Sequence, residues 1–294
     1  MTLDRRLNAF RSDLADSKLE GKVEAARFVE ARPAVIAVPV ADLHVAPARD
    51  AGIDTQFLLG ETVRVFDVAK GWAWVQGERD SYVGYMPGSS LSFELEPAPT
   101  HRVTALRSYV FPEPELKKPP LASLSMGSLV TIAGEEVRRG TRYAMLPDGS
   151  AMPAVHVAPL GEIAPDYVAV AERFLNTPYL WAGASGFGID CSGLVQLAMS
   201  MAGRKVLRDT DMQEASIGEV LDTGGNYSSL RRGDLVFWRG HVGIMTDADN
   251  LLHANGSTMT VALEPLSAAI DRIEPHYGPP ISVRRPETGY RSSW

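Results

Sequence analysis

A weak internal repeat of short strand patterns constrains what the first half of this chain can fold into. The segment GETVRV at Gly60 recurs as GSLVTI at Gly127, and the YMP ending at Pro87 recurs as the AMP ending at Pro153. The two offsets are 67 and 66 residues. Repetition at a constant period is typical of duplicated structural units, so these strand-like copies predict two small β-barrels. Coincidence between two generic β segments is the alternative.

The pattern inside the first copy is that of a β-hairpin. Residues 62–68 (TVRVFDV) and residues 72–76 (WAWVQ) have the alternation and the β-forming residues of half-buried strands. Lys70 and Gly71 supply the turn between them. Strand and turn patterns of this kind continue over residues 33–160, which favours an all-β region.

The character of the sequence changes after Pro165. The segment DYVAVAERFLNTPYLW begins as an amphipathic helix, with Val168, Ala171 and Leu175 on one side and a break before Pro178.

A second helical pattern and three strand patterns follow. Leu194, Leu197, Ala198 and Met201 form an apolar stripe that ends at Gly203. The segments GDLVFW, HVGIMT and NLLHANG then have the composition of strands with tight turns. Helices followed by strands predict an α+β domain.

These patterns divide the chain into four segments. Proline-rich stretches without periodicity at residues 94–100 and 158–167 fall where interdomain linkers are expected. The expected segments are an N-terminal arm, residues 1–32, two barrels, residues 33–96 and 97–160, and the α+β domain, residues 161–294. An arm that wraps the last domain is one interpretation, but the sequence does not indicate where residues 1–32 dock.

Charge and composition exclude several partners and compartments. The 29 basic and 36 acidic residues give a net charge of −7, whereas nucleic acids and anionic membranes favour a basic surface. We therefore expect neither partner. Residues 1–22 lack the apolar core of a signal peptide, which predicts a cytoplasmic protein unless an upstream leader is missing. No metal-ligand or phosphate-loop spacing is found, so no cofactor is expected. The oligomeric state is unknown from the sequence.

The single cysteine, Cys191, lies in GIDCSGLVQLAMSMAG at the start of the second predicted helix. The dipole and unbonded N–H groups of a helix N-terminus stabilise a thiolate and can hold an oxyanion. Asp190 or Ser192 can cap this helix, and Gly193 allows a substrate to approach the backbone closely. A lone cysteine is otherwise an inert, buried apolar residue.

A nucleophilic cysteine needs a base, and two of the six histidines lie on consecutive predicted strands. A hairpin that carries His241 and His253 would place an acceptor beside an imidazole, which is how a nucleophile, base and orienting group are combined. Because strand side chains alternate, the two share a face only if the loop around residues 247–250 has an odd residue count or a bulge intervenes. Satisfied structural histidines are the alternative.

The blocks TPYLWAGASGFGIDCSGLVQ, RGDLVFW…HVGIM and LLHANG resemble the NlpC/P60 family of cysteine peptidases. That family has a papain-like core and hydrolyses peptides of bacterial cell walls. The resemblance covers about residue 164 to the C-terminus. It implies Cys191 as the nucleophile, His241 as the general base and acid, and His253 as the polar residue that orients His241.

One position departs from the family's pattern. The family often has Trp-Gly-Gly where this chain has Trp181, Ala182 and Gly183. The added methyl group is a small change. We expect the side chains of Trp181 and Trp238 in the core rather than in a binding site.

The front half extends the resemblance. Paired bacterial SH3-like barrels ahead of this domain are similar to those of γ-D-glutamyl-L-diamino acid endopeptidases, in which the first barrel forms one wall of the site and caps the substrate's amino end. The resemblance implies Tyr82 as the tyrosine of that wall, with Asp80 or Asp54 as an acidic neighbour. A structural role for Tyr82 is equally open, since tyrosines commonly fill barrel edges.

The same resemblance implies further substrate-binding residues around the cysteine. Asp190 and Ser192 would assist amine recognition, and the Tyr179 hydroxyl would lie near the oxyanion. The block LRDTDMQ is similar to the family's Arg-Asp-Ser block, with Thr210 in the serine's place and Arg208 close to the substrate's carboxylates. Independently of any family, a buried ammonium group needs carboxylate and hydroxyl acceptors. A surface ion pair is the alternative for Arg208.

Three functions stay open. The first is a recycling endopeptidase that cleaves the γ-D-Glu–diamino acid bond of cell-wall peptides with a free N-terminal L-Ala, the diamino acid being diaminopimelate or lysine. The second is an exported hydrolase of intact peptidoglycan that uses the barrels as wall anchors. The third is a non-catalytic wall-binding module. The acidic charge and the missing leader favour the first function. The sequence does not indicate the diamino acid or how strictly a free amine is required.

Overall fold

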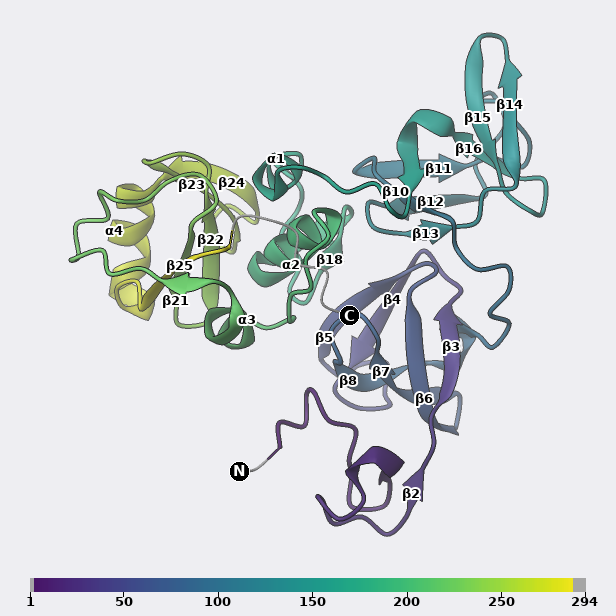
Figure 1. The fold of residues 1–294 in the computed structure, drawn as a ribbon, viewed down its shortest axis with the longest axis horizontal. Helices are drawn as coiled ribbons and strands as arrows, with labels where there is room; N and C mark the ends of the chain where they lie inside the picture. Colours follow the sequence, from purple (N-terminus) through teal and green to yellow (C-terminus); the bar gives the residue numbers. More distant parts are fainter. Residues whose placement is uncertain (1–2, 288–294) are drawn as a thin grey trace. The chain divides into compact units, whose positions relative to one another are not determined.

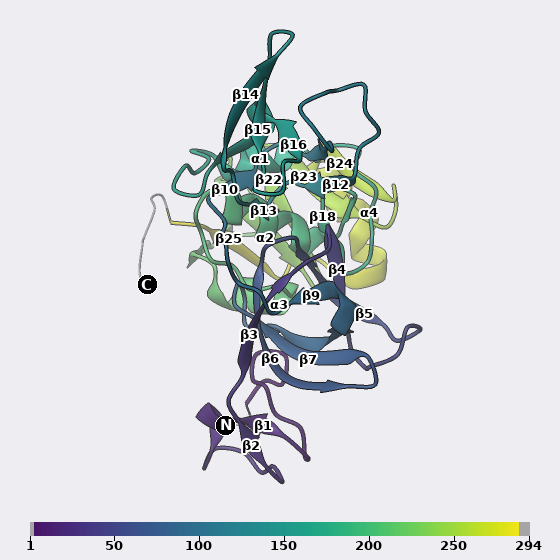
Figure 2. The same ribbon diagram turned by 90° about the vertical axis from the view of Figure 1, so that its right-hand side faces the viewer.

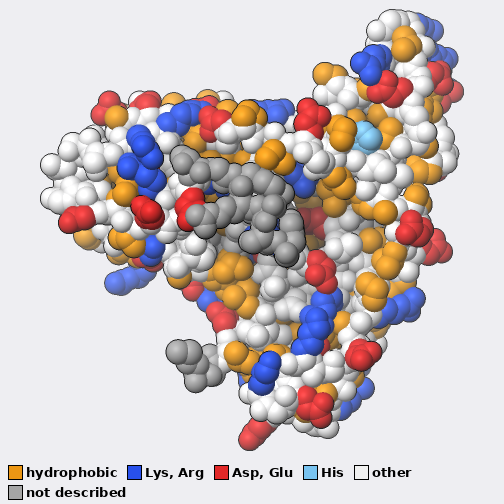
Figure 3. Space-filling view, viewed as in Figure 1, with side chains coloured by type: hydrophobic (Ala, Val, Ile, Leu, Met, Phe, Trp, Pro, Cys, Tyr) orange, Lys and Arg blue, Asp and Glu red, His pale blue; other side chains and the backbone are white. Residues whose placement is uncertain are grey.

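The computed structural model describes residues 3–287 of the chain. The chain divides into two compact units, residues 1–162 and residues 163–294, whose strands and helices are labelled in Figure 1. On the face shown in Figure 3, basic and acidic side chains are interspersed. No helix in the described range is long and apolar enough to cross a membrane.

A seven-stranded antiparallel sheet forms the first part of unit one. The predicted hairpin is present as β6 (Thr62–Ala69) and β7 (Trp72–Gly77). Lys70 and Gly71 between them take φ angles of 52° and 83°, as in the tight turns that join twisted antiparallel strands, and the hairpin prediction is confirmed. The strand order is β5-β4-β8-β7-β6-β3-β9. The other strands are β3 (Arg32–Ile36), β4 (Val40–His44), β5 (Ile53–Leu58), β8 (Val83–Pro87) and β9 (Leu91–Ser92).

The N-terminal segment docks on this sheet. Its short elements are β1 (Ala15–Asp16), η1 (Ser17–Leu19) and β2 (Phe28–Val29). Leu14 packs in one apolar cluster with Phe66 and Trp74 of the sheet. The guanidinium of Arg11 lies 4.4 Å from the ring centre of Trp74 and donates to Asp67 at 2.9 Å. Apolar burial and a cation over an indole face therefore anchor the arm within the first unit.

The rest of unit one consists of three smaller antiparallel sheets, with orders β13-β10-β17, β11-β12 and β14-β15-β16. Figure 2 shows the β14–β15 hairpin extending away from the neighbouring strands. The strands are β10 (His101–Val103), β11 (Arg107–Val110), β12 (Ala122–Ser125), β13 (Leu129–Val130), β14 (Gly134–Arg138), β15 (Thr141–Met145), β16 (Ala151–Pro153) and β17 (Val157–Pro159).

Both ends of the sequence repeat correspond to equivalent local structure. Gly60 and Gly127 take positive φ, 81° and 95°, and each stands two residues before a strand, β6 and β13. The strands that end at Pro87 and Pro153 each lead into a 3-10 turn, η2 (Gly88–Ser90) and η3 (Ala154–His156), and then into a short strand. The two copies therefore share these backbone features as well as sequence.

The second unit is built on a six-stranded antiparallel sheet of order β20-β25-β21-β22-β23-β24. The three strands predicted from the sequence are confirmed as β21, β22 and β23. The strands are β20 (Glu219–Val220), β21 (Leu235–Trp238), β22 (His241–Met245), β23 (Asn250–Asn255), β24 (Thr260–Pro265) and β25 (Ser282–Arg285), and a separate hairpin pairs β18 (Ala184–Ser185) with β19 (Gly188–Ile189).

Within residues 163–287, four helices accompany this sheet, and the sequence had indicated two of them. The α+β character of the unit is confirmed. In Figure 1 the sheet lies between α2 and α4. Leu266, Ala269 and Ile273 of α4 pack on the sheet through Trp238 and Met245, a helical spacing that could have revealed α4. The helices are α1 (Tyr167–Glu172), α2 (Cys191–Met201), α3 (Thr210–Ser216) and α4 (Leu266–Tyr277).

Two expectations about apolar side chains are wrong. Leu175 is 44% exposed, because α1 ends at Glu172 and the chain turns at Asn176, whose φ is 67°. Trp181 is 73% exposed. It lies in a turn closed by the Gly183 N–H donating to the Leu180 carbonyl at 2.9 Å, and its indole is directed away from the core. Trp238 is buried, as expected.

Candidate active site

Cys191 is the first residue of α2, as predicted. Asp190 is the N-cap, and its Oδ1 accepts a hydrogen bond from the Gly193 N–H at 2.7 Å. The first-turn N–H groups of a helix have no partner within the helix. The sulfur is therefore held at the positive end of a helix of 11 residues.

The structure explains the glycine at position 193 by close packing of the backbone, whereas the sequence indicated the approach of a substrate. A Cβ at Gly193 would lie 2.3 Å from the carbonyl oxygen of Gly183. That carbonyl also accepts from the Asp190 N–H at 3.1 Å. The missing side chain admits a neighbouring backbone segment, which holds the residues before Cys191 against α2.

The electrostatic surroundings of Cys191 favour the thiol form at rest. Burial, and then the charge of Asp190, raises the pKa of Cys191 to about 11. The Val242 N–H, the Arg208 charge and a hydrogen bond from the Thr210 side chain act in the opposite direction. These contacts place Thr210 of α3 and the backbone after His241 beside the sulfur. Free energy for forming the thiolate must therefore come from a base and from such donors.

The two predicted histidines face each other across adjacent strands. His241 is the first residue of β22 and His253 lies in β23, and Nε2 of His241 is 2.8 Å from Nδ1 of His253. Met245 pairs with Leu251, so five residues separate the paired positions. That odd count puts both imidazoles on the same face of the sheet, which is the condition that strand alternation imposes.

Burial keeps His241 uncharged. Desolvation, followed by the nearby His253 and Arg272, lowers the pKa of His241 to about 3, while Glu264 opposes this shift. A neutral imidazole can accept a proton. Since Nε2 is bonded to His253, Nδ1 is the ring nitrogen left to accept a proton.

Sequence reasoning missed two charged residues behind the histidines. His253 Nε2 lies 2.7 Å from Oε1 of Glu264 in β24, and Arg272 of α4 donates to the same oxygen. The hydrogen bond from His253 and then that from Arg272 hold the pKa of Glu264 at about 2, against the opposing effect of burial. The signal that could have found Glu264 is strand alternation in a third strand, which follows HANG by a short turn.

Arg208 is buried, which overturns the surface ion pair considered for it. Its Nη2 donates to Asp190 Oδ2 at 2.7 Å, and its Nη1 donates to Asp190 Oδ1 at 3.0 Å and to Ser192 Oγ at 2.7 Å. The charge of Asp190 raises the pKa of Arg208 against the effect of burial, which lowers it. Arg208 therefore fixes the cap of α2 and the residue after the nucleophile.

Tyr179 also lies close to the cysteine. Burial, and then the charges of Cys191 and Asp190, raises the pKa of Tyr179 to about 12. Its backbone N–H donates to the Met259 carbonyl at 2.8 Å, and it bridges to Ile189 two residues before Cys191. The phenol therefore stays a hydrogen-bond donor at neutral pH.

The other predicted binding residues belong to the first unit. Tyr82 is buried, and its backbone N–H donates to Asp80 Oδ1 at 3.1 Å. The buried side chain of Asp80 lies 3.3 Å from Arg79, which also pairs with Glu61. Asp54 lies half-buried on β5. The structure brings Tyr82 and Asp80 together, and their part in a binding site stays a prediction.

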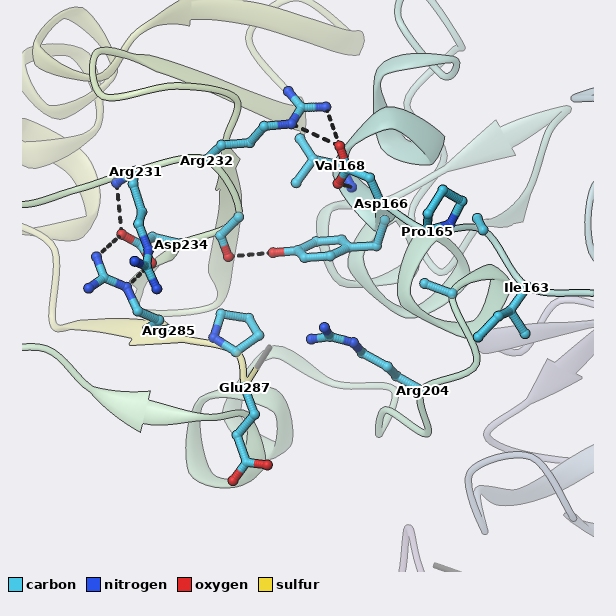
Figure 4. Close-up of a pocket in the computed structure, with 15 residues that line it drawn as sticks. Ile163, Pro165, Asp166, Val168, Arg204, Arg231, Arg232, Asp234, Arg285 and Glu287 are labelled. Carbon is cyan, nitrogen blue, oxygen red and sulfur yellow. Dashed lines mark hydrogen bonds and ion pairs between the residues drawn. The ribbon is translucent and has the colours of Figure 1, made fainter. Parts of the chain in front are cut away.

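A cavity of about 390 Å³ lies elsewhere in the second unit, between the start of α1, the loop that leads into β21 and the end of β25. Figure 4 shows that ion pairs cross it: Arg232 bonds Asp166 at 2.9 Å and Arg285 bonds Asp234 at 2.7 Å. Because these charged side chains pair with one another, we interpret the cavity as a structural feature that joins α1 to the sheet. Within residues 3–287, no group of three His, Cys, Asp or Glu side chains is placed to hold a metal ion.

Comparison with known proteins identifies two segments of the chain. Residues 43–91 match the model described as the bacterial dipeptidyl-peptidase Sh3 domain, and residues 176–273 match that of the NlpC/P60 family. Two curated proteins named γ-D-glutamyl-L-lysine dipeptidyl-peptidase are each 28% identical. The one from Bacillus cereus aligns over 73% of this chain and 71% of its own length, and the one from Bacillus subtilis over 78% and 81%.

A solved structure shares the fold. The crystal structure of an NlpC/P60 family protein from Bacillus cereus superposes with a TM-score of 0.71 and is 23% identical, covering 86% of this chain and 99% of that one. The similarity spans both compact units and supports the arrangement of elements described above.

Proposed function

We propose, from the NlpC/P60 cysteine peptidase domain at residues 176–273 and the Sh3 domain at residues 43–91, that this chain is an endopeptidase acting on cell-wall peptides. Its substrate would be L-Ala-γ-D-Glu-diamino acid with a free amino end, cleaved after γ-D-Glu. The observation that carries the catalytic part is Cys191 at the start of α2 beside the hydrogen-bonded His241–His253 pair. The names of the Bacillus relatives support the substrate class.

The first chemical step is formation of the acyl-enzyme. His241 Nδ1 takes the Cys191 proton as the sulfur attacks the γ-glutamyl carbonyl carbon, so an S–C bond forms and the carbonyl becomes an oxyanion. First-turn N–H groups of α2 and the neutral Tyr179 hydroxyl are the donors available to that oxyanion. Because these donors are held in place before the reaction, they need not reorganise as charge develops.

The second half of the reaction returns the enzyme to its resting state. The protonated His241 gives its proton to the departing amine of the diamino acid as the C–N bond breaks. Water then loses a proton to His241 and attacks the thioester, the C–S bond breaks, and the sulfur recovers a proton. L-Ala-γ-D-Glu is released as the free acid.

Substrate recognition is proposed for residues of both units. Asp190 and Ser192 already bond Arg208, so together they would present a neutralised, hydrogen-bonding surface beside the cysteine rather than a free carboxylate. Recognition of the substrate ammonium would then depend on Asp80 or Asp54 together with Tyr82. Thr210 would act by donating a hydrogen bond to the sulfur of Cys191.

The finer architecture forms part of the same proposal. Residues 33–96 and residues 97–160 would be two SH3-like barrels, supported by the matching turns at Gly60 and Gly127. The catalytic domain would have a papain-like arrangement, supported by a cysteine on a helix N-terminus and a histidine on a strand.

The test is mass spectrometry of synthetic L-Ala-γ-D-Glu-L-Lys and its diaminopimelate counterpart after incubation with the wild type and with Cys191→Ser. We expect L-Ala-γ-D-Glu from the wild type and none from the variant. An N-acetylated tripeptide measures the requirement for a free amine, and intact sacculi measure action on polymer. Release by both proteins, or by neither, would contradict the proposal. Preferential release from sacculi would favour a hydrolase of intact wall, and binding to sacculi without cleavage would favour a wall-binding module.

A further inference from the structure

Behind His241, a continuous line of hydrogen bonds crosses three adjacent strands and reaches α4. His241 stands in β22, His253 in β23 and Glu264 in β24, with contacts of 2.8 and 2.7 Å between successive side chains. Arg272 of α4 closes the line on Oε1 of Glu264. His253 is fully buried, and both of its ring nitrogens are engaged.

The charge of Glu264 decides which nitrogens carry protons along this line. A carboxylate only accepts, so His253 must donate from Nε2. Where His253 is neutral, it offers a lone pair at Nδ1, and His241 donates to it from Nε2. The neutral His241 is left with an unprotonated Nδ1, the ring nitrogen not bonded to His253, to which we assign the thiol proton.

The opposite protonation would disable the base. A protonated Glu264 would donate to His253 Nε2, so His253 would carry its proton on Nδ1 and donate it to His241 Nε2. His241 would then hold its proton at Nδ1, where it cannot accept one from Cys191. Arg272 prevents this state because its cation favours the carboxylate.

We propose that Glu264 and Arg272 are positioning residues that set the tautomers of His253 and His241 and thereby make His241 a base toward Cys191. The pair touches neither substrate nor sulfur and acts only through the two imidazoles. The inference rests on the proposed peptidase function, since it assigns how that site is prepared.

Further charged and titratable groups act on His241 and Cys191. His241 is influenced by His253, Arg272 and Glu264, and Trp238 of β21 packs against its ring with a centroid separation of 5.8 Å. The groups that influence Cys191 are Asp190, Arg208, Thr210 and Tyr179. The bonds of Glu264 are with His253 and Arg272, so we expect a change at Glu264 to reach the sulfur through the histidines.

The first test is Glu264→Gln in the full chain, which keeps the shape of the side chain and removes its charge. We expect kcat on the tripeptide to fall about 10- to 100-fold, the loss typical of removing a partner that orients a functional histidine, with KM within about twofold, because no substrate contact is lost. Glu172→Gln is the matched control. Glu172 pairs with Arg232 at the surface of the same unit, and its removal should leave kcat unchanged.

The second test needs no substrate and reads the thiol directly. The rate of Cys191 alkylation by iodoacetamide is measured from pH 6 to pH 11 (the range around its reference pKa) in the wild type and both variants. We expect Glu264→Gln to react more slowly near pH 7, where His241 must take the proton. Its rate should converge with that of the wild type at high pH, where hydroxide removes the proton. Equal slowing at every pH would indicate general damage to the site and overturn the proposal.

A third measurement observes the tautomers themselves. Nitrogen-15 chemical shifts of the histidine rings distinguish a protonated from an unprotonated Nδ1. We expect protonated Nε2 on both His241 and His253 in the wild type, and a fraction of His241 protonated at Nδ1 in Glu264→Gln, whose amide can donate to His253 as well as accept from it. Protonated Nδ1 on His241 in the wild type would refute the inference. If Glu264→Gln does not fold, Arg272→Lys, which keeps the cation, and Arg272→Met, which removes it, provide the same comparison.

The two proposals can fail independently. If the wild type does not cleave the tripeptide, but Glu264→Gln slows Cys191 alkylation only near pH 7, the proposed substrate is wrong and the positioning role is kept. A wild type that cleaves the tripeptide, with Glu264→Gln equal to Glu172→Gln, keeps the peptidase and removes the positioning role.

Discussion

Replacing Arg208 tests whether its role is to hold the catalytic helix rather than to bind substrate. Arg208→Met keeps a long side chain in the same space but removes the hydrogen bonds that the guanidinium donates to Asp190, Ser192 and the Gly183 carbonyl. The carboxylate of Asp190 would then be buried without its partner. Breaking one side of such a pair costs about 3–5 kcal/mol.

The matched control is Arg232→Met in the same unit. Arg232 makes comparably short bonds to Glu172, at 2.6 and 2.9 Å, but its side chain is 38% exposed whereas that of Arg208 is 2% exposed. Solvent screens the exposed pair, so its loss should cost no more than about 1 kcal/mol. The difference between the two variants therefore measures burial rather than the number of bonds.

The assay is urea unfolding of the full chain, monitored by hydrogen–deuterium exchange in peptides from α2. Because α2 belongs to the second unit, its exchange reports the unfolding of that unit alone. We expect α2 to begin to exchange at a lower urea concentration in Arg208→Met than in Arg232→Met. The rate of Cys191 alkylation should rise over the same range of urea concentration. Combining Arg208→Met with Asp190→Asn should recover part of the loss, since the unpaired charge is gone. A free energy of unfolding for Arg208→Met within about 0.5 kcal/mol of the control, the range of ordinary surface substitutions, would refute the reasoning.

Two further substitutions probe the surroundings of the sulfur. Gly193→Ala places a Cβ 2.3 Å from the Gly183 carbonyl oxygen, and a backbone atom cannot move aside as a side chain can. We expect the free energy of unfolding to fall by about 1–3 kcal/mol and kcat to fall markedly. An unchanged thermal unfolding midpoint would contradict this. Thr210→Val removes the hydroxyl that stabilises the thiolate, so the pKa of Cys191, already raised to about 11, should rise further. Alkylation at neutral pH should slow and its inflection move to higher pH, and an unmoved inflection would show that Thr210 does not bond the sulfur.

The features that the sequence determined are local. A polar cap, a turn and an apolar stripe were enough to place Cys191 at the start of α2, because capping and amphipathic spacing involve residues within one turn of each other. Strand alternation and the loop length were enough to state when His241 and His253 would share a face. The repeated turns at Gly60 and Gly127 also follow from local backbone needs.

The features that only the tertiary structure decided are contacts between distant segments. The sequence left a surface ion pair open for Arg208, and the fold buries its side chain against Asp190, because a buried carboxylate needs a partner. Trp181 was expected in the core, and a tight turn exposes it.

The preparation of the base that we propose likewise depends on the assembled fold. Glu264 and Arg272 carry no motif, and they acquire a role only when β24 lies beside β23 and α4 packs over both. The sequence thus determined which residues could react, since reactivity begins with residue type and local capping. The tertiary structure decided how those residues are charged and held, because electrostatic fields and buried hydrogen bonds depend on neighbours brought together from far along the chain.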